Sequence, residues 1–221
     1  MPAVDVIDPA PVGFVELRDD ALVCRRCRLA EGRTQVVFGA GDPTADLMFV
    51  GEGPGAQEDL QGLPFVGRSG QLLDRLMAEE MGITRDDCYI ANVVKCRPPD
   101  NRDPSADEVS ACRPWLETQI DMIGPRVIVT LGNFASKLLV DTSDGITKVR
   151  GSVYPYRARP DGVVVQLVPT FHPAAVLRGG ADPMAKMRSD LVRAKQALTA
   201  GPAGATGPAG LAGPTGSGAA S

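Results

Sequence analysis

Two cysteines near the start of the chain, Cys24 and Cys27, have the C-x2-C spacing that lets two sulfur atoms bind one centre. Two thiolates rarely hold a metal alone, so the site needs further ligands. Cys88 begins an apolar, strand-like run and is interpreted as a core residue, whereas Cys96 follows that run and Cys112 lies in the next helical segment. We therefore predict a four-thiolate site whose spacing alone leaves Zn²⁺, an iron–sulfur cluster and no metal open.

The chain contains one histidine, His172, in the stretch "VPTFHPAAVLRGG". A lone histidine is more often structural than catalytic. This one directly follows a predicted buried strand, and Pro173 restricts the backbone after it. Because ligands of parallel α/β sheets bind at the carboxyl ends of the strands, we predict a catalytic role for His172.

A glycine-rich loop, "VGEGPGAQEDLQGLPFVGRSG", follows the first predicted strand. Gly51, Gly53 and Ala56 match the dinucleotide fingerprint G-x-G-x-x-A. The match is weak, because Pro54 and Pro64 are expected to delay the helix that would meet a pyrophosphate. The acidic residue that would bind a ribose is also missing after the second strand. A nicotinamide- or flavin-dependent enzyme remains an alternative.

The elements that must position these residues alternate between strand and helix. Short apolar runs predict strands at 45–50, 88–94, 126–132 and 162–173. Helical periodicity predicts helices at 69–82, 105–124 and 182–198, and a further one beginning near Asn133. Ser105 and Glu108 have the spacing of a capping box. Near-continuous apolar strands between helices predict a parallel sheet covered on both faces.

Composition and charge limit the classes of protein to which this chain can belong. The 221 residues are 43% hydrophobic and carry a net charge of −4, which disfavours a uniformly basic nucleic-acid binder but leaves a local basic face open. No apolar run is long enough for a membrane helix, and the acidic, proline-containing start does not resemble a secretory signal. We expect a cytoplasmic protein with reduced cysteines.

The predicted domain organisation is simple. Residues 13–200 are expected to form a single domain, preceded by a flexible segment at 1–12. Residues 201–221 are rich in Gly, Pro and Ala, and we expect a disordered tail. The segment contains Gly-x-y triplets, but it is too short to form a collagen triple helix.

Five stretches in chain order resemble the iron–sulfur (type 4) uracil-DNA glycosylases: "GEGPG", "PFVGRSG", "NVVKCRPP", "GITKVRG" and "HPAAVLR". The four-cysteine pattern is part of the same resemblance. It implies a [4Fe–4S] cluster on Cys24, Cys27, Cys96 and Cys112, and a three-layer α/β/α sandwich with a four-stranded parallel sheet. The implied activity is excision of uracil flipped out of DNA, by hydrolysis of its N-glycosidic bond, in base excision repair.

The resemblance also implies roles for pocket residues. Phe65 would stack on the uracil, Asn92 would read its ring N–H and O4, and Glu58 would lie near C5 and exclude thymine. His172 would donate a hydrogen bond to O2 of the departing base, assisted by backbone N–H groups around Gly53. Glu52 would hold the loop or position water. Ala56 and Gln57 stand where relatives often carry acids.

Contacts to DNA are expected outside the pocket. Leu177 and Arg178 would fill the gap left by the extruded base and contact phosphate, and Lys148 and Arg150 would add positive charge. The partner is uracil-containing DNA, single- or double-stranded, bound by a monomer. A related class links covalently to DNA through a histidine between the second strand and the last cysteine, and "RPPDNRDPSADEVSA" contains none. A non-catalytic DNA-binding module is the other alternative, disfavoured by the joint presence of Phe65, Asn92 and His172.

Overall fold

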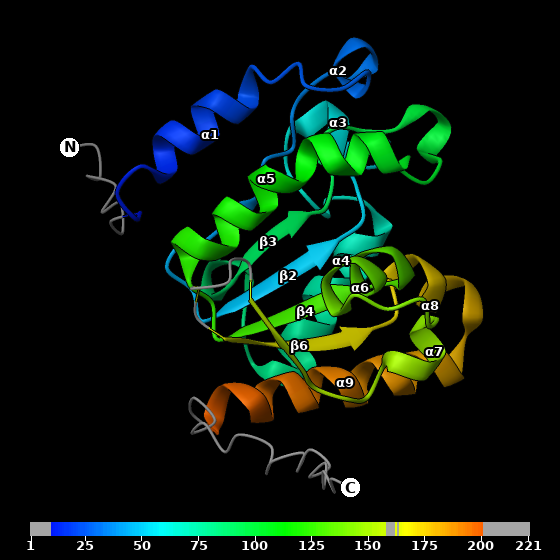
Figure 1. Ribbon diagram of the computed structural model, residues 1–221. Helices are drawn as coiled ribbons and strands as arrows, with labels where there is room; N and C mark the ends of the chain where they lie inside the picture. The colour runs from blue at the N-terminus through cyan, green and yellow to red at the C-terminus, as the bar shows by residue number, and fades with distance from the viewer. Residues whose placement is uncertain (1–9, 158–161, 163, 201–221) are drawn as a thin grey trace, which may run out of the picture.

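A six-stranded sheet organises the protein in a computed structural model that describes residues 10–157, 162 and 164–200 (Figure 1). The strand order is β1-β3-β2-β4-β6-β5. The strands are β1 (Ala40–Gly41), β2 (Leu47–Gly51), β3 (Tyr89–Asn92), β4 (Val127–Leu131), β5 (Tyr154–Tyr156) and β6 (Val165–Thr170). The four central strands are parallel, as predicted, and β1 and β5 add antiparallel edges that the sequence did not predict.

The central strands are buried along almost their whole length. Every residue of β2, β3 and β4 is buried, which explains why they are apolar without alternation. In the parallel register Gly51 lies opposite Asn92, so the ends of β2 and β3 meet at one edge of the sheet. The segment after β6, which carries His172, reaches the same edge, because Gly132 after β4 donates its N–H to the carbonyl of Thr170.

Helices cover both faces of the sheet and make it the middle of three layers (Figure 1). One hydrophobic core joins the sheet to α1, α5 and α6, and a second joins it to α4, α8 and α9. The helices are α1 (Phe14–Leu22), α2 (Leu29–Gly32), α3 (Ala56–Gln61), α4 (Arg68–Leu76), α5 (Ala106–Ile123), α6 (Asn133–Val140), α7 (Ile146–Val149), α8 (Pro173–Gly179) and α9 (Ala181–Thr199), with short turns η1 (Met77–Met81), η2 (Arg85–Asp87) and η3 (Pro99–Asn101).

The longest helices agree with the sequence prediction. Helix α5 begins with the predicted capping box, in which both Ser105 and Glu108 bond the backbone, and ends at Gly124 with φ 62°. The predicted helix at 69–82 is α4 continued by the wider turn η1. The prediction that helix formation is delayed after the first strand is wrong, because the six-residue α3 begins at Ala56.

Several predictions concern parts of the chain outside the described residues. The tail at 201–221 and residues 1–9 of the N-terminal segment lie there, so both predictions stay open. Within the described ranges, no helix combines the length and hydropathy required to cross a bilayer. Cys88 lies in the core with its side chain fully buried, as expected.

Candidate active site

A cavity of about 500 Å³ lies at the carboxyl ends of the parallel strands. It is lined by all six residues that the sequence predicted for the base-binding pocket: Glu52, Gly53, Glu58, Phe65, Asn92 and His172. These residues follow β2, end β3 or follow β6, so the parallel topology brings together segments that are far apart in the chain.

The floor of the cavity is closely packed around Asn92. A Cβ atom on Gly51 would lie 2.5 Å from Asn92 Oδ1 and 2.6 Å from the Phe65 ring, so any larger residue would displace both. Asn92 is 1% exposed, and its Oδ1 has no hydrogen-bond partner among the residues that the structure describes. A buried amide oxygen without a partner carries a desolvation cost, which a ligand N–H would remove.

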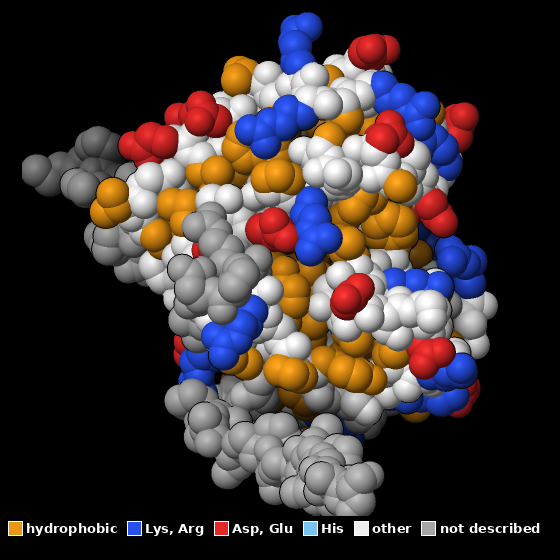
Figure 2. All heavy atoms as spheres, in the orientation of Figure 1, with side chains coloured by type: hydrophobic (Ala, Val, Ile, Leu, Met, Phe, Trp, Pro, Cys, Tyr) orange, Lys and Arg blue, Asp and Glu red, His pale blue; other side chains and the backbone are white. Residues whose placement is uncertain are grey.

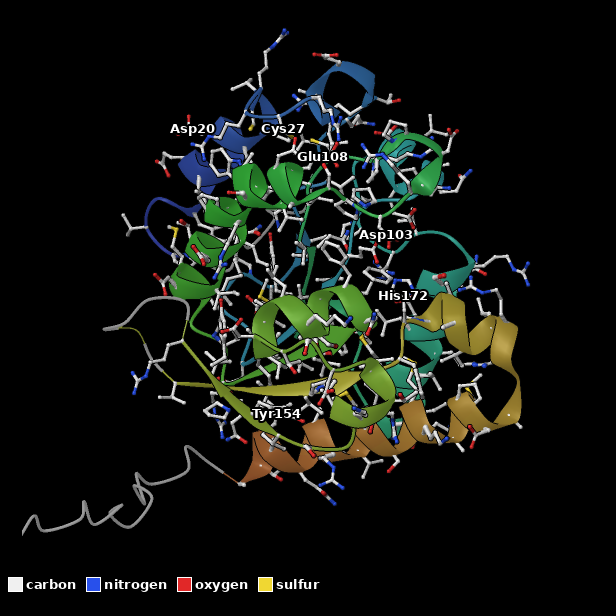
Figure 3. All side chains as sticks on the ribbon, turned by 45° about the vertical axis from the view of Figure 1, so that its right-hand side comes forward. Asp20, Cys27, Asp103, Glu108, Tyr154 and His172 are labelled. Carbon is white, nitrogen blue, oxygen red and sulfur yellow. The ribbon has the colours of Figure 1, made fainter. Side chains whose placement is uncertain are left out.

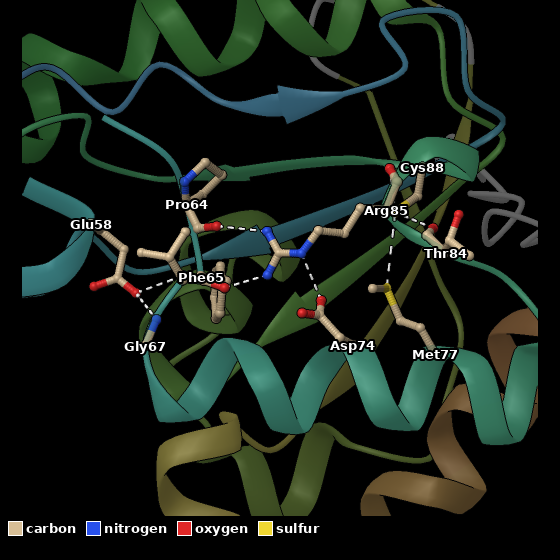
Figure 4. A network of polar contacts seen from close by, with 10 residues as sticks. Glu58, Pro64, Phe65, Gly67, Asp74, Met77, Thr84, Arg85 and Cys88 are labelled. Carbon is tan, nitrogen blue, oxygen red and sulfur yellow. Dashed lines mark hydrogen bonds and ion pairs between the residues drawn. The ribbon is translucent and has the colours of Figure 1, made fainter. Parts of the chain in front are cut away.

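The backbone around Phe65 is held by two charged side chains (Figure 4). Phe65 has φ 53°, an uncommon conformation for a bulky residue. Arg85 donates to the carbonyl oxygens of Pro64 and Phe65 and to Asp74. Glu58 accepts from the N–H groups of Val66 and Gly67 at 3.0 and 3.1 Å. These contacts stabilise the strained residue, whose ring faces the cavity.

His172 caps helix α8 and presents a neutral imidazole to the cavity. Its Nδ1 accepts the N–H of Ala174 at 3.1 Å, so the ring proton resides on Nε2. Burial and the charge of Arg178 lower the pKa of His172 to about 4, with an opposing effect of Glu58. Its ring centroid lies 5.7 Å from that of Phe65. Gly132 must be glycine for two reasons. Its φ is 92°, and a Cβ atom at this position would lie only 2.8 Å from His172 Cβ.

Glu52 is an unusual carboxyl group in this cavity. Burial, the charge of Asp103 and a hydrogen bond with Asp103 raise the pKa of Glu52 to about 7. Arg102 and Asp103 also line the cavity, although the sequence motifs did not predict either of them as a pocket residue. Their position in the chain could have indicated a place at the pocket, because the segment that joins Cys96 to α5 starts where β3 ends.

The residues predicted to contact DNA do not all gather at the cavity. Arg178 lines it, and Leu177 is exposed beside it on α8. Neither Lys148 nor Arg150 lines the cavity. Lys148 pairs with Asp144 at 3.0 Å, and Arg150 donates to both carboxylate oxygens of Asp190. On the face drawn in Figure 2, basic and acidic side chains are interspersed and do not form one basic field.

The four cysteines predicted to bind a metal line one separate cavity, together with Trp115. In the described parts of the chain, no three His, Cys, Asp or Glu side chains lie together as a site for a single metal ion. Cys96 Sγ accepts from Arg33 at 3.4 Å and Cys112 Sγ from the N–H of Lys95 at 3.3 Å. The buried Nε1 of Trp115 lacks a partner among the described residues. A sulfur-rich group would accept from such a donor.

Glu108 connects the cysteine cavity to the first cavity (Figure 3). Its buried carboxylate accepts from Arg28, next to Cys27, and from Arg102, which lines the first cavity. Hydrogen bonds from Arg102 hold the pKa of Glu108 far below its usual range. Glu108 on α5 therefore binds both the N-terminal segment, through Arg28, and the wall of the pocket, through Arg102.

The fold and the site define an α/β protein with a polar and aromatic pocket at the carboxyl ends of its parallel strands, and comparisons identify its family. Residues 38–196 match the model of the "Uracil DNA glycosylase superfamily". The chain is 46% identical to a type-4 uracil-DNA glycosylase of Sulfurisphaera tokodaii, over 73% of this chain and 74% of that protein. It is 45% identical to a type-4 enzyme of Thermotoga maritima, over 78% and 88% respectively, and 41% identical to one of Saccharolobus solfataricus, over 84% and 87%. The chain belongs to the type-4 uracil-DNA glycosylases.

Proposed function

We propose that this protein removes uracil from DNA by hydrolysing the N-glycosidic bond, which leaves an abasic site for base excision repair. The observation that carries the proposal is the buried Oδ1 of Asn92, which has no hydrogen-bond partner in the described part of the chain, in a pocket that also holds a neutral His172. Uracil presents a ring N–H for that oxygen and an O4 acceptor for the amide N–H. The type-4 glycosylases to which the chain is similar support the same substrate.

The chemistry follows from the charges of the pocket. Uracil must leave the base stack to reach the cavity, where Phe65 offers a ring on which it can stack. As the C1′–N1 bond breaks, its electron pair moves to the uracil anion, and negative charge develops at O2. The Nε2–H of His172 donates to that oxygen, a contact that strengthens in the transition state. Glu52 assists the attack of water on the sugar.

We further infer that Cys24, Cys27, Cys96 and Cys112 hold a [4Fe–4S] cluster. The four cysteines line one cavity, and four thiolates suit an iron–sulfur cluster or Zn²⁺. The similarity to type-4 enzymes favours the cluster. The donors of Arg33 and Trp115 favour an electron-rich group there. Such a cluster would join the segment before α2, the end of β3 and α5.

The site is complete within one chain, which supports a monomer acting on single- or double-stranded DNA. Arg178 and the exposed Leu177 beside the cavity are the candidates for phosphate contact and for filling the vacated stack. The free thiols of the described residues are compatible with the reducing cytoplasm. Lys148 and Arg150 remain weaker candidates for DNA contact, because Asp144 and Asp190 already pair with them.

The test is release of uracil by the purified protein from single-stranded oligonucleotides and from duplexes with a single uracil. We expect uracil release and an abasic site that is cleaved by alkali, with no release from matched thymine oligonucleotides. Absence of uracil release from every substrate would contradict the proposal. A nicotinamide- or flavin-dependent enzyme would instead contain a bound nucleotide cofactor, detectable in the denatured supernatant.

A further inference from the structure

Two carboxyl groups from different loops meet at the edge of the base pocket. Glu52 follows β2, and Asp103 follows η3. Both line the first cavity, and both also line a second cavity of about 930 Å³ between α6, α5 and β5. Figure 3 shows Asp103 close to His172 at the same end of the molecule. The pair therefore faces the base pocket on one side and a second solvent-accessible space on the other.

The carboxyl groups of Glu52 and Asp103 lie close enough for a hydrogen bond when one of them is protonated. Burial, the negative charge of Asp103 and this hydrogen bond together raise the pKa of Glu52 to about 7. Below that pH the protonated Glu52 donates to the Asp103 carboxylate. Above it both groups are ionised, and Glu52 becomes able to accept a proton. Asp103 is exposed, whereas Glu52 is half-buried, so Glu52 lies on the inner side of the pair.

Other charged groups face the same spaces. In the first cavity they are Glu58, Arg102 and Arg178, with the imidazole of His172. In the second they are Arg113, Lys137, Asp141 and Arg157. Arg102 forms an ion pair with Glu108, and Arg113 forms one with Glu117. Asp103 differs from all of these groups in lying close enough to hydrogen-bond with Glu52.

We propose that Asp103 is a positioning residue that orients Glu52, at the edge shared by the two cavities, to accept the proton of the attacking water. The inference rests on the proposed function. In the step concerned, the C1′–N1 bond has broken and its electron pair has left with the uracil anion. The oxygen of water then bonds to C1′, and one of its protons moves to the Glu52 carboxylate. The second cavity gives water a route to the pair while the base fills the first.

The experiment is the pH dependence of single-turnover uracil release, normalised to each variant's plateau. In the wild type we expect the rate to rise through a midpoint near pH 7, and Glu52→Gln should abolish this rise. Asp103→Asn removes the neighbouring charge and supplies an N–H donor to the Glu52 carboxylate, so its midpoint should move to lower pH by about one unit. Asp103→Glu should restore a midpoint near that of the wild type.

The matched control is Asp100→Asn, which removes a charge from the same loop at an exposed position that lines neither cavity. Its midpoint should stay at the wild-type value. An unchanged midpoint in Asp103→Asn, or an equal shift in Asp100→Asn, would overturn the inference.

A second measurement separates this inference from the proposed function. NMR titration of isotope-labelled glutamate carboxyl groups reports the pKa of Glu52 directly, with assignment by loss of its signal in Glu52→Gln. A wild type that releases no uracil contradicts the function, and the titration then still decides whether Asp103 raises the pKa of Glu52. A Glu52 pKa that is the same in the wild type and in Asp103→Asn refutes the interaction of the two carboxyl groups, whatever the enzyme does.

Discussion

At the scale of single residues, Asn92 and His172 offer complementary groups to one planar ring. The unpartnered Oδ1 of Asn92 can accept a proton donor, and the Nε2–H of His172 can donate. Gly51 keeps the space above Asn92 open, because a Cβ atom there would overlap its oxygen. In the proposed function, uracil would supply the hydrogen bonds that these groups otherwise lack, and selection of this kind discriminates more strongly than apolar contact does.

Replacing His172 tests the stabilisation of the departing base. We expect His172→Ala to slow single-turnover excision by roughly 10²–10³-fold, the range for loss of one donor to a developing anion. Binding of uracil-containing DNA should change far less, since the contact strengthens in the transition state. Because the pKa of His172 is about 4, the imidazole should remain neutral from pH 5 upward and contribute no rate change there. Unchanged single-turnover rates in His172→Ala would assign the residue a structural role.

Replacing Asn92 tests the choice of base. Cytosine inverts the pattern of uracil, because its ring nitrogen accepts and its exocyclic amine donates, so the wild type should reject it by about 10⁴–10⁵-fold. Asn92→Asp loses the amide donor and gains an acceptor for the amine, so selectivity should weaken. The added negative charge near the departing anion should slow release of both bases. The rates of uracil and cytosine release are measured in single-turnover reactions on otherwise identical single strands. If Asn92→Asp keeps full uracil activity and full preference over cytosine, Asn92 does not recognise the base.

At the scale of elements, the cysteine cavity joins three segments that the sheet alone does not hold together. Cys24 and Cys27 lie between α1 and α2, Cys96 follows β3, and Cys112 lies on α5. We expect protein purified without oxygen to be brown, with about four iron atoms per chain. Cys96→Ala should lose the visible absorption, whereas Cys88→Ala, at a buried position outside this cavity, should keep it. Stoichiometric zinc without iron would contradict the cluster.

Glu108 on α5 also joins distant segments, because its carboxylate pairs with Arg28 near the N-terminus and with Arg102 after β3. Glu108→Gln weakens charge-assisted hydrogen bonds to Arg28 and Arg102, and should lower the free energy of unfolding by about 1.5–3 kcal/mol at pH 7. Because the pKa of Glu108 is depressed in the folded state, its contribution is present above the usual value of 4.5 and is lost as the pH falls below it. The stability difference between wild type and variant should therefore narrow in acid.

Denaturant unfolding at several pH values measures this difference. The control is Glu117→Gln on the same helix, which removes a partly exposed pair with Arg113 and should cost no more than about 1 kcal/mol. Equal losses in the two variants would contradict the anchoring role of Glu108.

At the scale of the whole molecule, the described residues form one three-layer unit, and the Gly/Pro/Ala-rich segment 201–221 lies outside them. Its composition provides little apolar surface with which to build a core. We expect removal of residues 201–221 to leave the melting temperature and the rate of uracil release unchanged. Thermal unfolding and the excision assay on the truncated chain check this, and a large drop in either would give the segment a role in folding or catalysis.

Elements with local signals could be predicted from the amino-acid sequence. The apolar runs of the four central strands and the capping box at Ser105 depend on neighbouring residues, so the parallel strands and helix α5 were predicted from them. The family resemblance implied which residues would meet in the pocket, and these residues do line one cavity at the carboxyl ends of the parallel strands.

Other features were decided by the tertiary structure. The edge strands β1 and β5 contain two and three residues, too few for any periodicity, and pair because β3 and β6 offer them free edges. The pairing of Arg150 with Asp190 joins α7 to α9, and no local pattern predicts it. Likewise, Asp103 and Glu52 line the same two cavities only because segments that follow β2 and β3 meet in space. Contacts of this kind depend on how the layers pack, and that information is spread over the whole chain.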